Sequence, residues 1–283
     1  MDQFVKDLTV FVRNSIVPIV QKRGWKIFCE IGGLTGSSAD QILRLPNVSY
    51  TIVDPGLDAD LLAKYADDRR VTVLQDISLE ALPKMAGFYD CILIDGDHNW
   101  YTVFNELNLI CQRGLLRPGG MIFLHDVDWP YGRRDLYYQP ETIPAEYRLP
   151  FERKGVLRGQ SALAETGGGN PHLCNAIHEG GPRNGVLTAV EDFLAEHPSE
   201  YQFCRIRVQH GLGILQSRSG DPAEDRTFLP IRIAAAWQNL CGFPKSVLRY
   251  ALSRSFPSWW GKRYRGACEP SPATNEKHPN TAT

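Results

Sequence analysis

Two short apolar segments of the chain end on acids and histidines. Each segment is typical of a buried parallel strand. The segments are residues 91–94 and 121–124, and the residues that follow them include Asp95, Asp97, His98, His125 and Asp126. Carboxylates and imidazoles can bind metal ions and transfer protons. Because ligands of an open α/β sheet lie outside the carboxyl ends of its strands, we expect the two groups to meet in one pocket.

A glycine-rich turn precedes these segments at residues 30–38. Glu30, Gly32 and Gly36 stand where a first strand is expected to end and a helix to begin. The glycines permit a tight turn and the close approach of a nucleotide-like ligand to backbone amides. The spacing differs from the Gly-x-Gly-x-x-Gly fingerprint of dinucleotide sites, and an acid stands where a pyrophosphate would bind. A carboxylate at that place suits a ligand that carries positive charge.

Further acids follow the next two expected strands. Asp54 is placed to accept hydrogen bonds from both hydroxyls of a ribose, and Asp76 could accept one from an adenine amino group. Acidic loops around a glycine-rich turn favour an adenosine ligand with a cationic group, a description that fits S-adenosylmethionine. The residues expected to contact it are Glu30, Gly32, Gly33, Gly36, Ser37, Asp54, Asp76 and Asp95.

The elements that would position these groups alternate along the chain. Strands are expected at residues 26–31, 49–53, 71–74, 91–94 and 121–124, the last after a turn at 118–120, and helices at 4–20, 39–45, 61–65 and 103–111. Such alternation predicts an α/β fold, with a parallel sheet covered by helices on both faces. After a helix over 186–196, residues 201–208 and 212–216 are expected to form an antiparallel hairpin at the sheet edge.

The regularity breaks between residues 127 and 185. This stretch is rich in Pro, Gly, Tyr and Arg, and it begins where the fifth strand is expected to end. A long aperiodic segment at that place favours a functional lid over an ordinary connection. Arg133, Arg134, Tyr137 and Tyr138 could hold a sugar, phosphate or carboxylate of the substrate. The same residues could equally pin the lid to the body.

Composition excludes several classes of protein. The formal net charge of -1 gives no reason to expect nucleic acid as the partner. The seven cysteines include no Cys-x-x-Cys pair, which indicates a reducing compartment. No apolar run approaches the roughly 20 residues of a spanning helix, so we expect a cytoplasmic protein without a transmembrane segment.

The predicted organisation is one elaborated domain over residues 1–217, with the lid inserted at 127–185. Residues 218–268 are expected to form a helical and basic extension, with a helix at 231–240, and residues 269–283 a disordered polar tail. The basic aromatic segment 243–265 could lie on an anionic membrane surface, although packing of such a helix on the domain is commoner. The sequence leaves open whether the chain forms a homo-oligomer.

The order of motifs resembles that of the class I S-adenosylmethionine-dependent methyltransferases. Residues 94–98 and 124–126 are similar to the branch with macrolide sugar (macrocin) and aminocoumarin sugar O-methyltransferases and the cephalosporin hydroxylase-like proteins. The resemblance covers residues 26–126 and extends to 210–213. It implies a Rossmann-like fold whose seven-stranded, mostly parallel sheet has its last strand antiparallel, with the lid inserted after the fifth strand.

In that branch a divalent cation, usually magnesium, is held by an acid after the fourth strand and an acidic pair after the fifth. Asp95 and Asp126 match these positions, whereas His125 stands where the family commonly has Asp or Glu. An imidazole favours a softer metal or a metal-free site. The proton acceptor of the family lies two or three residues beyond the first metal acid, where Asp97 and His98 both qualify. We take His98 as the base, with Asp97 orienting it or acting itself.

Methyl transfer to a hydroxyl is an in-line displacement at a sulfonium carbon, and a sugar hydroxyl lacks nucleophilicity at neutral pH. A divalent cation lowers the pKa of the hydroxyl, and a base takes the proton. The sequence predicts an S-adenosylmethionine-dependent O-methyltransferase for a small polar acceptor, a sugar or glycosylated metabolite. The alternatives are a hydroxylase-like metal-dependent oxidative enzyme and a non-catalytic adenosine-ligand-binding module. Asp95 and Asp126 could also simply cap the helices that follow them.

Overall fold

A seven-stranded sheet organises the chain, of which the computed structural model describes residues 5–241. The strands are β1 (Ile27–Ile31), β2 (Ser49–Val53), β3 (Val71–Leu74), β4 (Tyr89–Ile94), β5 (Leu116–His125), β9 (Tyr201–Ile206) and β10 (Leu212–Ser217). Their order across the sheet is β3-β2-β1-β4-β5-β10-β9. The predicted extension beyond residue 241, its segment 243–265 and the tail 269–283 lie outside the described residues.

The direction of the strands matches the expected topology. The pairs β1–β2, β1–β4, β2–β3 and β4–β5 are parallel. Strand β10 runs antiparallel to both β5 and β9, so the last strand is the reversed one. The predicted Rossmann-like fold of class I methyltransferases, with a mostly parallel sheet and a hairpin at its edge, is confirmed.

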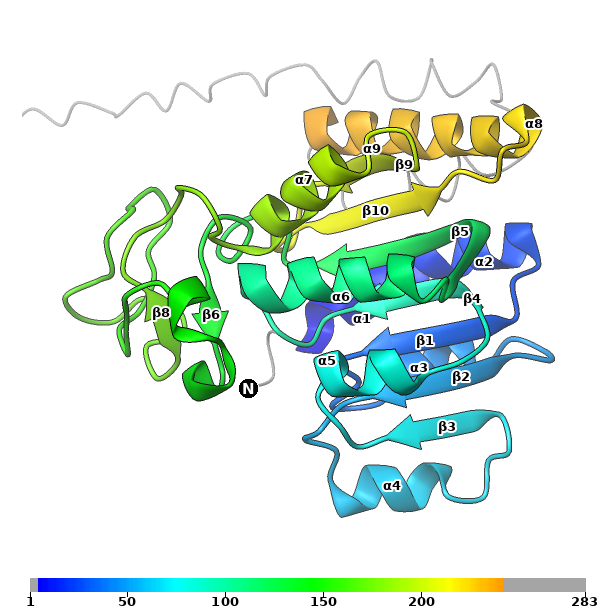
Figure 1. Ribbon diagram of the computed structural model, residues 1–283, viewed down its shortest axis with the longest axis horizontal. Coiled ribbons are helices and arrows are strands. Elements are labelled where there is room, and N and C mark those ends of the chain that lie inside the picture. The colour runs from blue at the N-terminus through cyan, green and yellow to red at the C-terminus, as the bar shows by residue number, and fades with distance from the viewer. Residues whose placement is uncertain (1–4, 242–283) are drawn as a thin grey trace, which may run out of the picture. The chain divides into compact units, whose positions relative to one another are not determined.

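Helices cover both faces of the sheet (Figure 1). One face packs against α1 (Val5–Phe11), α2 (Val17–Arg23), α3 (Ser37–Ile42), α4 (Ala59–Tyr65) and α9 (Leu229–Cys241), with a π-helical turn at Val12–Ile16. The other face packs against α5 (Ser78–Ala81), α6 (Trp100–Gln112) and α7 (Val186–Glu196). A short helix, α8 (Pro222–Asp225), precedes α9. None of the helices within residues 5–241 is both long and apolar enough to cross a membrane.

The apolar composition of the central strands follows from this double cover. All six residues of β4 are buried, because helices pack on both of its faces. The N-cap of the helix that follows, α6, is Asn99, whose side-chain oxygen accepts a hydrogen bond from the Thr102 amide at 2.8 Å. This capping bond satisfies an amide that has no partner within the helix.

Strand β5 is longer than the sequence indicates. Residues 118–120, expected as a turn before the strand, lie within it. Gly119 has φ of +77°, and the register with β4 shifts between Tyr89 and Cys91. A glycine in the left-handed region accommodates this irregularity without a Cβ penalty.

The segment 127–185 has its own small sheet. Strands β6 (Leu136–Tyr137), β7 (Phe151–Glu152) and β8 (Cys174–Ala176) pair in the order β6-β8-β7, all antiparallel. The buried carboxylate of Asp135 joins this lid to the body, because it accepts hydrogen bonds from the amides of Trp100 at 2.7 Å and Gly185 at 2.6 Å. Asp135 and the last residue of the lid are thereby tied to the start of α6.

Candidate functional site

A cavity of about 400 Å³ lies at the carboxyl ends of β1, β2, β3 and β4. Its wall contains Gly32 after β1, Asp54 after β2, residues 77–79 after β3 and residues 95–97 after β4. Helix α6 adds Thr102 and Glu106, and the lid adds residues 138–139 and 142–143. This volume falls in the range of small-molecule sites, at the place where open α/β sheets bind ligands.

Close packing against other parts of the protein explains the glycines of the first turn. Gly32 has φ of +91°, and a Cβ there would collide with the carbonyl of Asp95 and with Gly96. A Cβ at Gly33 would collide with Ile52, and one at Gly36 would lie 2.6 Å from Leu61 Cδ1. Of these glycines, Gly32 lines the cavity. The turn after β1 therefore lies directly against the segment after β4, which also lines the cavity.

Asp54 lies in the cavity wall, as its predicted role requires. The carboxylate is largely buried, and Oδ1 accepts a hydrogen bond from the Gly56 amide at 2.7 Å. Burial raises the pKa of Asp54, and the hydrogen bonds from the amides of Gly56 and Leu34 oppose this rise.

Glu30, Ser37 and Asp76 do not line the cavity. Glu30 lies buried beneath the turn and accepts a hydrogen bond from the Tyr50 hydroxyl at 3.0 Å. Burial raises the pKa of Glu30 to about 7, although its hydrogen bonds lower it. The Asp76 carboxylate pairs with Lys84 Nζ at 3.1 Å. The structure therefore places the segment just after Asp76, rather than its carboxylate, at the cavity.

Glu106 is a cavity residue that the sequence analysis missed. It is fully buried on α6, and Oε1 accepts a hydrogen bond from the Ser78 hydroxyl at 2.5 Å. Oε2 has no hydrogen-bond partner, so it is available to a bound ligand. Burial raises the pKa of Glu106 to about 8. Its helical position next to apolar residues gave no signal of a site.

We expect Glu106→Gln to stabilise the protein at alkaline pH. The raised pKa means that the proton of Glu106 stabilises the fold below about pH 4.5 and that this contribution is lost as pH rises toward 8. Glutamine is neutral throughout and can still accept the Ser78 hydrogen bond. The gain at pH 9 should be at least about 1 kcal/mol, or about 2–4 °C in melting temperature. Melting curves at pH 5 and pH 9 check this, and an equal effect at both would contradict it.

Asp95, His98, His125 and Asp126 form a cluster, named here the quartet. One ligand atom from each lies within 4.8 Å of those of the others. His125 Nδ1 lies 2.9 Å from Asp95 Oδ1 and 3.2 Å from Asp126 Oδ2, and His98 Nε2 lies 2.8 Å from Asp126 Oδ2. Asp126 has φ of +56°, a conformation that costs energy for a residue other than glycine. Strain at this residue is a feature often found at functional sites.

The charges of the quartet are strongly coupled. Burial alone would lower the pKa of His98, but the carboxylates of Asp126 and Asp95 raise it to about 10. The same carboxylates raise the pKa of His125 well above its usual range, again against burial. Burial opposes ionisation of the two acids, yet the histidines hold their pKa values below the ordinary one. Without a cation, the quartet therefore holds two imidazoliums and two carboxylates.

The quartet also fits a divalent metal ion. Nε2 of His125 and Oδ1 of Asp126 are buried without a hydrogen-bond partner. One dication could balance the two carboxylates in place of the two imidazolium protons. The donor set of two imidazoles and two carboxylates suits a softer ion than magnesium, which prefers oxygen ligands.

Two neighbours complete this region. His210, in the turn between β9 and β10, places Nδ1 at 3.8 Å from Asp126 Oδ1. The hydroxyl of Tyr138 in the lid lies 3.4 Å from His98 Nδ1, and Tyr138 lines the cavity. His210 lies far from the quartet in sequence, and only the hairpin topology brings it there. Tyr138 is the one predicted lid contact that the structure places at the cavity.

The other three predicted acceptor contacts have partners within the protein. Arg133 forms a bidentate ion pair with Glu191 of α7, with N–O distances of 2.6 and 2.7 Å. Arg134 is buried and donates to the carbonyls of Ala176 and Ser161. The Tyr137 hydroxyl donates to Asp135 at 2.7 Å. These contacts favour the alternative role, in which the three residues pin the lid to the body.

Comparison with known proteins points in the same direction as the geometry. Residues 29–127, about a third of the chain, match a family described as a methyltransferase domain. This match supports a class I S-adenosylmethionine-dependent methyltransferase. A search of curated proteins found no match.

Solved methyltransferase structures show a similar arrangement. An SAH-bound methyltransferase from Podospora anserina is 16% identical, with a TM-score of 0.45, and the similarity covers 75% of this chain and 76% of that one. A putative caffeoyl-CoA O-methyltransferase from Staphylococcus aureus is 16% identical, with a TM-score of 0.44 and coverage of 77% and 84%. Human N-acetylserotonin methyltransferase in complex with SAM is 16% identical, with a TM-score of 0.44 and coverage of 76% and 55%.

Proposed function

We propose that the chain is an S-adenosylmethionine-dependent O-methyltransferase that acts on a small polar acceptor. The observation that carries this proposal is the cavity at the strand ends, which adjoins the quartet through Asp95. One wall offers a carboxylate for a ribose and apolar side chains for an adenine, and the other offers groups that can activate a hydroxyl. The match of residues 29–127 to a methyltransferase domain supports the same reaction.

The cofactor is assigned to the side of the cavity formed by β1, β2 and β3. Asp54 accepts hydrogen bonds from the two ribose hydroxyls, and the adenine lies against Ile77 and Leu79. Glu106 and Ser78 lie at the same side and offer the adenine edge a hydrogen-bonding group. The sulfonium is directed toward Asp95, the first carboxylate after β4, which favours its positive charge.

We expect Asp54→Ala to weaken S-adenosylmethionine binding about a hundredfold or more. Each hydrogen bond to a charged group contributes about 1.5–3 kcal/mol, and a carboxylate can accept two from a ribose. Calorimetric titration of the folded variant measures the loss. Asp76→Ala is the matched control, because the Asp76 carboxylate pairs with Lys84 outside the cavity and its removal should leave the affinity near that of the parent. Equal affinity in the Asp54 variant would place the ribose elsewhere.

The acceptor hydroxyl is assigned to the side formed by the quartet and the lid. Asp95, His98, His125 and Asp126 would hold a divalent cation, which would lower the pKa of a hydroxyl bound beside it. Tyr138 offers an aromatic face, and Gln139 and Thr142 offer polar groups, at the lid side of the cavity. Such a surface suits a sugar or a glycosylated metabolite, because sugars combine apolar faces with many hydroxyls.

We assign the role of general base to Asp97 in preference to His98. His98 lies between two carboxylates, and with a pKa of about 10 it keeps its proton at neutral pH unless a cation replaces it. Asp97 lines the cavity, and burial raises the pKa of its carboxyl. Thr102 donates a hydrogen bond to Asp97 Oδ2 at 3.1 Å and so fixes the orientation of the carboxylate. The other oxygen, Oδ1, can take the proton of the acceptor.

One feature of the quartet favours a second candidate function. Two imidazoles with a carboxylate are the donor set of non-haem iron oxygenases. A metal-dependent oxidative enzyme would need iron and an oxidising cosubstrate. Oxygen consumption by the iron-loaded protein, set beside methyl transfer by the same sample, separates the two candidates, since only an oxygenase should take up oxygen.

A further inference from the structure

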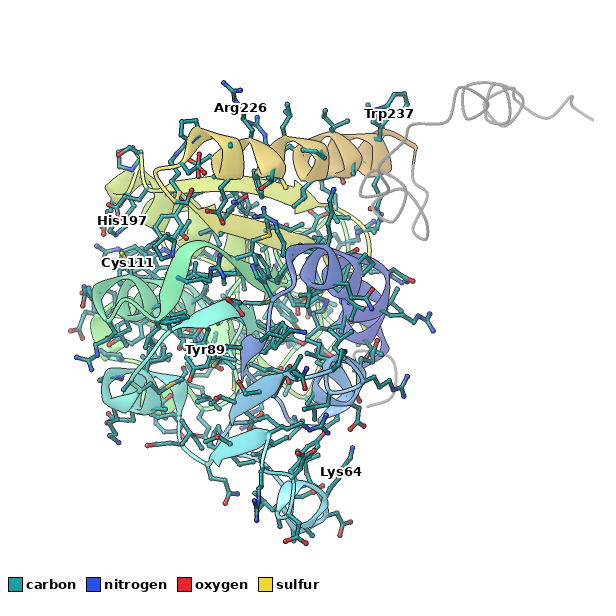
Figure 2. All side chains as sticks on the ribbon, turned by 90° about the vertical axis from the view of Figure 1, so that its right-hand side faces the viewer. Lys64, Tyr89, Cys111, His197, Arg226 and Trp237 are labelled. Carbon is teal, nitrogen blue, oxygen red and sulfur yellow. The ribbon has the colours of Figure 1, made fainter. Side chains whose placement is uncertain are left out.

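A second cluster of metal-ligating side chains lies away from the candidate site. Cys111 is in the last turn of α6, His197 follows the last residue of α7, and Glu200 directly precedes β9. Their ligand atoms lie within 4.8 Å of one another. Figure 2 shows the side chains of Cys111 and His197 close together at one edge. Because β9 is parallel to β5, its first residue lies at the end of the sheet opposite to the quartet.

The local backbone holds these donors in place. The His197 amide bonds to the Phe193 carbonyl at 3.1 Å, and the Glu200 amide bonds to the His197 carbonyl at 3.2 Å, so a tight turn sets the last two donors side by side. The His197 ring packs against the rings of Phe193 and Tyr201, with centroids 4.5 and 6.2 Å apart. These contacts fix the plane of the imidazole before any ligand binds, which lowers the entropic cost of binding.

The distances between the donor atoms are close to the spacing of ligands around a tetrahedral metal ion. His197 Nδ1 lies 2.9 Å from Glu200 Oε1, and Cys111 Sγ lies 3.9 Å from Glu200 Oε2. Metal–sulfur bonds of about 2.3 Å and metal–nitrogen or metal–oxygen bonds of about 2.0 Å place tetrahedral ligands about 3.5 Å apart. Small rotations of the half-exposed Glu200 side chain can bring all three donors to that spacing.

The charge around the cluster favours a cation. Cys111 and His197 stand at the carboxyl ends of α6 and α7, and the carboxyl end of a helix carries partial negative charge. A thiolate, an imidazole and a carboxylate are the ligand types of zinc sites, and three protein ligands leave a fourth position for water. The cluster is reachable from solvent, because side-chain exposure is 20% for His197 and 56% for Glu200.

We propose that Cys111, His197 and Glu200 form a binding site for a divalent transition-metal ion of the zinc class. Such an ion would link the ends of α6 and α7 to the start of β9. The site is independent of the proposed methyl transfer, because it lies at the opposite end of the sheet and uses none of the cavity residues.

The test is titration of the reduced, metal-free protein with Co²⁺, followed by absorption spectroscopy. A cobalt–thiolate bond gives a charge-transfer band in the near ultraviolet that nitrogen and oxygen ligands do not give. The quartet contains no sulfur, so cobalt bound there does not produce this band. We expect the band to saturate by two equivalents, because the quartet can take up one of them, to disappear in Cys111→Ser, and to need about tenfold or more cobalt in His197→Ala.

The matched control is Cys204→Ser, because Cys204 is also a partly buried free cysteine. This variant should keep the band, and circular dichroism should show that every variant is folded. Cobalt binding without the thiolate band would overturn the proposal. A band that survives in Cys111→Ser would do the same, because the thiolate would then belong to another cysteine.

Discussion

Raising the pH by one unit between 6 and 8 should strengthen binding of a divalent transition metal to the quartet about a hundredfold. Metal ligands must be deprotonated, so binding releases the protons that the ligands carry. His98 has a pKa of about 10, and the pKa of His125 is raised well above its usual range, so both are protonated in the metal-free protein. The two carboxylates are already ionised, because their pKa values are lowered. Two protons are therefore released per ion.

Competition with a chromophoric chelator at several pH values measures this slope. The Cys111→Ser background removes the second proposed cation site from the titration. In that background, His98→Asn should reduce the slope to about tenfold per pH unit, because one proton remains to be displaced. An affinity that does not change with pH would contradict the charge state of the quartet described above.

Turnover should fall about 10²–10⁴-fold in Asp97→Asn, which removes the proposed base without changing the size of the side chain. The acceptor hydroxyl then keeps its proton, and the sulfonium methyl meets a poor nucleophile. Binding of S-adenosylmethionine should stay within a few-fold of the parent, because the cofactor is held mainly by groups at the other side of the cavity. Transfer of labelled methyl groups to an acceptor found in a panel of sugars and glycosides measures turnover, and calorimetry measures binding.

Asp76→Asn is the matched control for this substitution. The Asp76 carboxylate faces Lys84 and does not line the cavity, so the same chemical change there should leave turnover nearly unaltered. Near-parental turnover in Asp97→Asn would remove Asp97 as the base. Joint loss of turnover and cofactor binding would show instead that Asp97 holds the cofactor.

The sheet could be predicted because buried parallel strands carry an unmistakable apolar pattern. Strand β2 has the predicted bounds, and β3 and α7 also begin and end where expected. The predicted start of β5 was wrong, because Pro118, Gly119 and Gly120 have the composition of a turn although they lie within the strand. Helix α5 has four residues and the lid strands two or three, too few for any periodicity to show.

Topology made part of the site predictable, and side-chain direction limited the rest. Asp95 and Asp126 follow neighbouring parallel strands and His125 is the last residue of the second, so their proximity is a consequence of strand order. Asp76 also follows a strand, but its carboxylate turns toward Lys84. Strand order sets where a residue lies, whereas the direction of its side chain depends on partners elsewhere in the chain.

Partners far along the chain account for the remaining differences. Arg133 meets Glu191 of α7, and Glu106 enters the cavity from a helix through its contact with Ser78. His210 reaches Asp126 from the last hairpin. Such pairings arise from tertiary packing, which the local sequence around each residue does not reveal.

Calorimetric titration of the folded protein with S-adenosylmethionine tests the proposed function most directly. We expect one molecule to bind per chain, with binding weakened about a hundredfold in Asp54→Ala and unchanged in Asp76→Ala. A folded protein that gives no binding signal with S-adenosylmethionine or with its demethylated product, with or without a divalent cation, would contradict the assignment of the cavity to this cofactor.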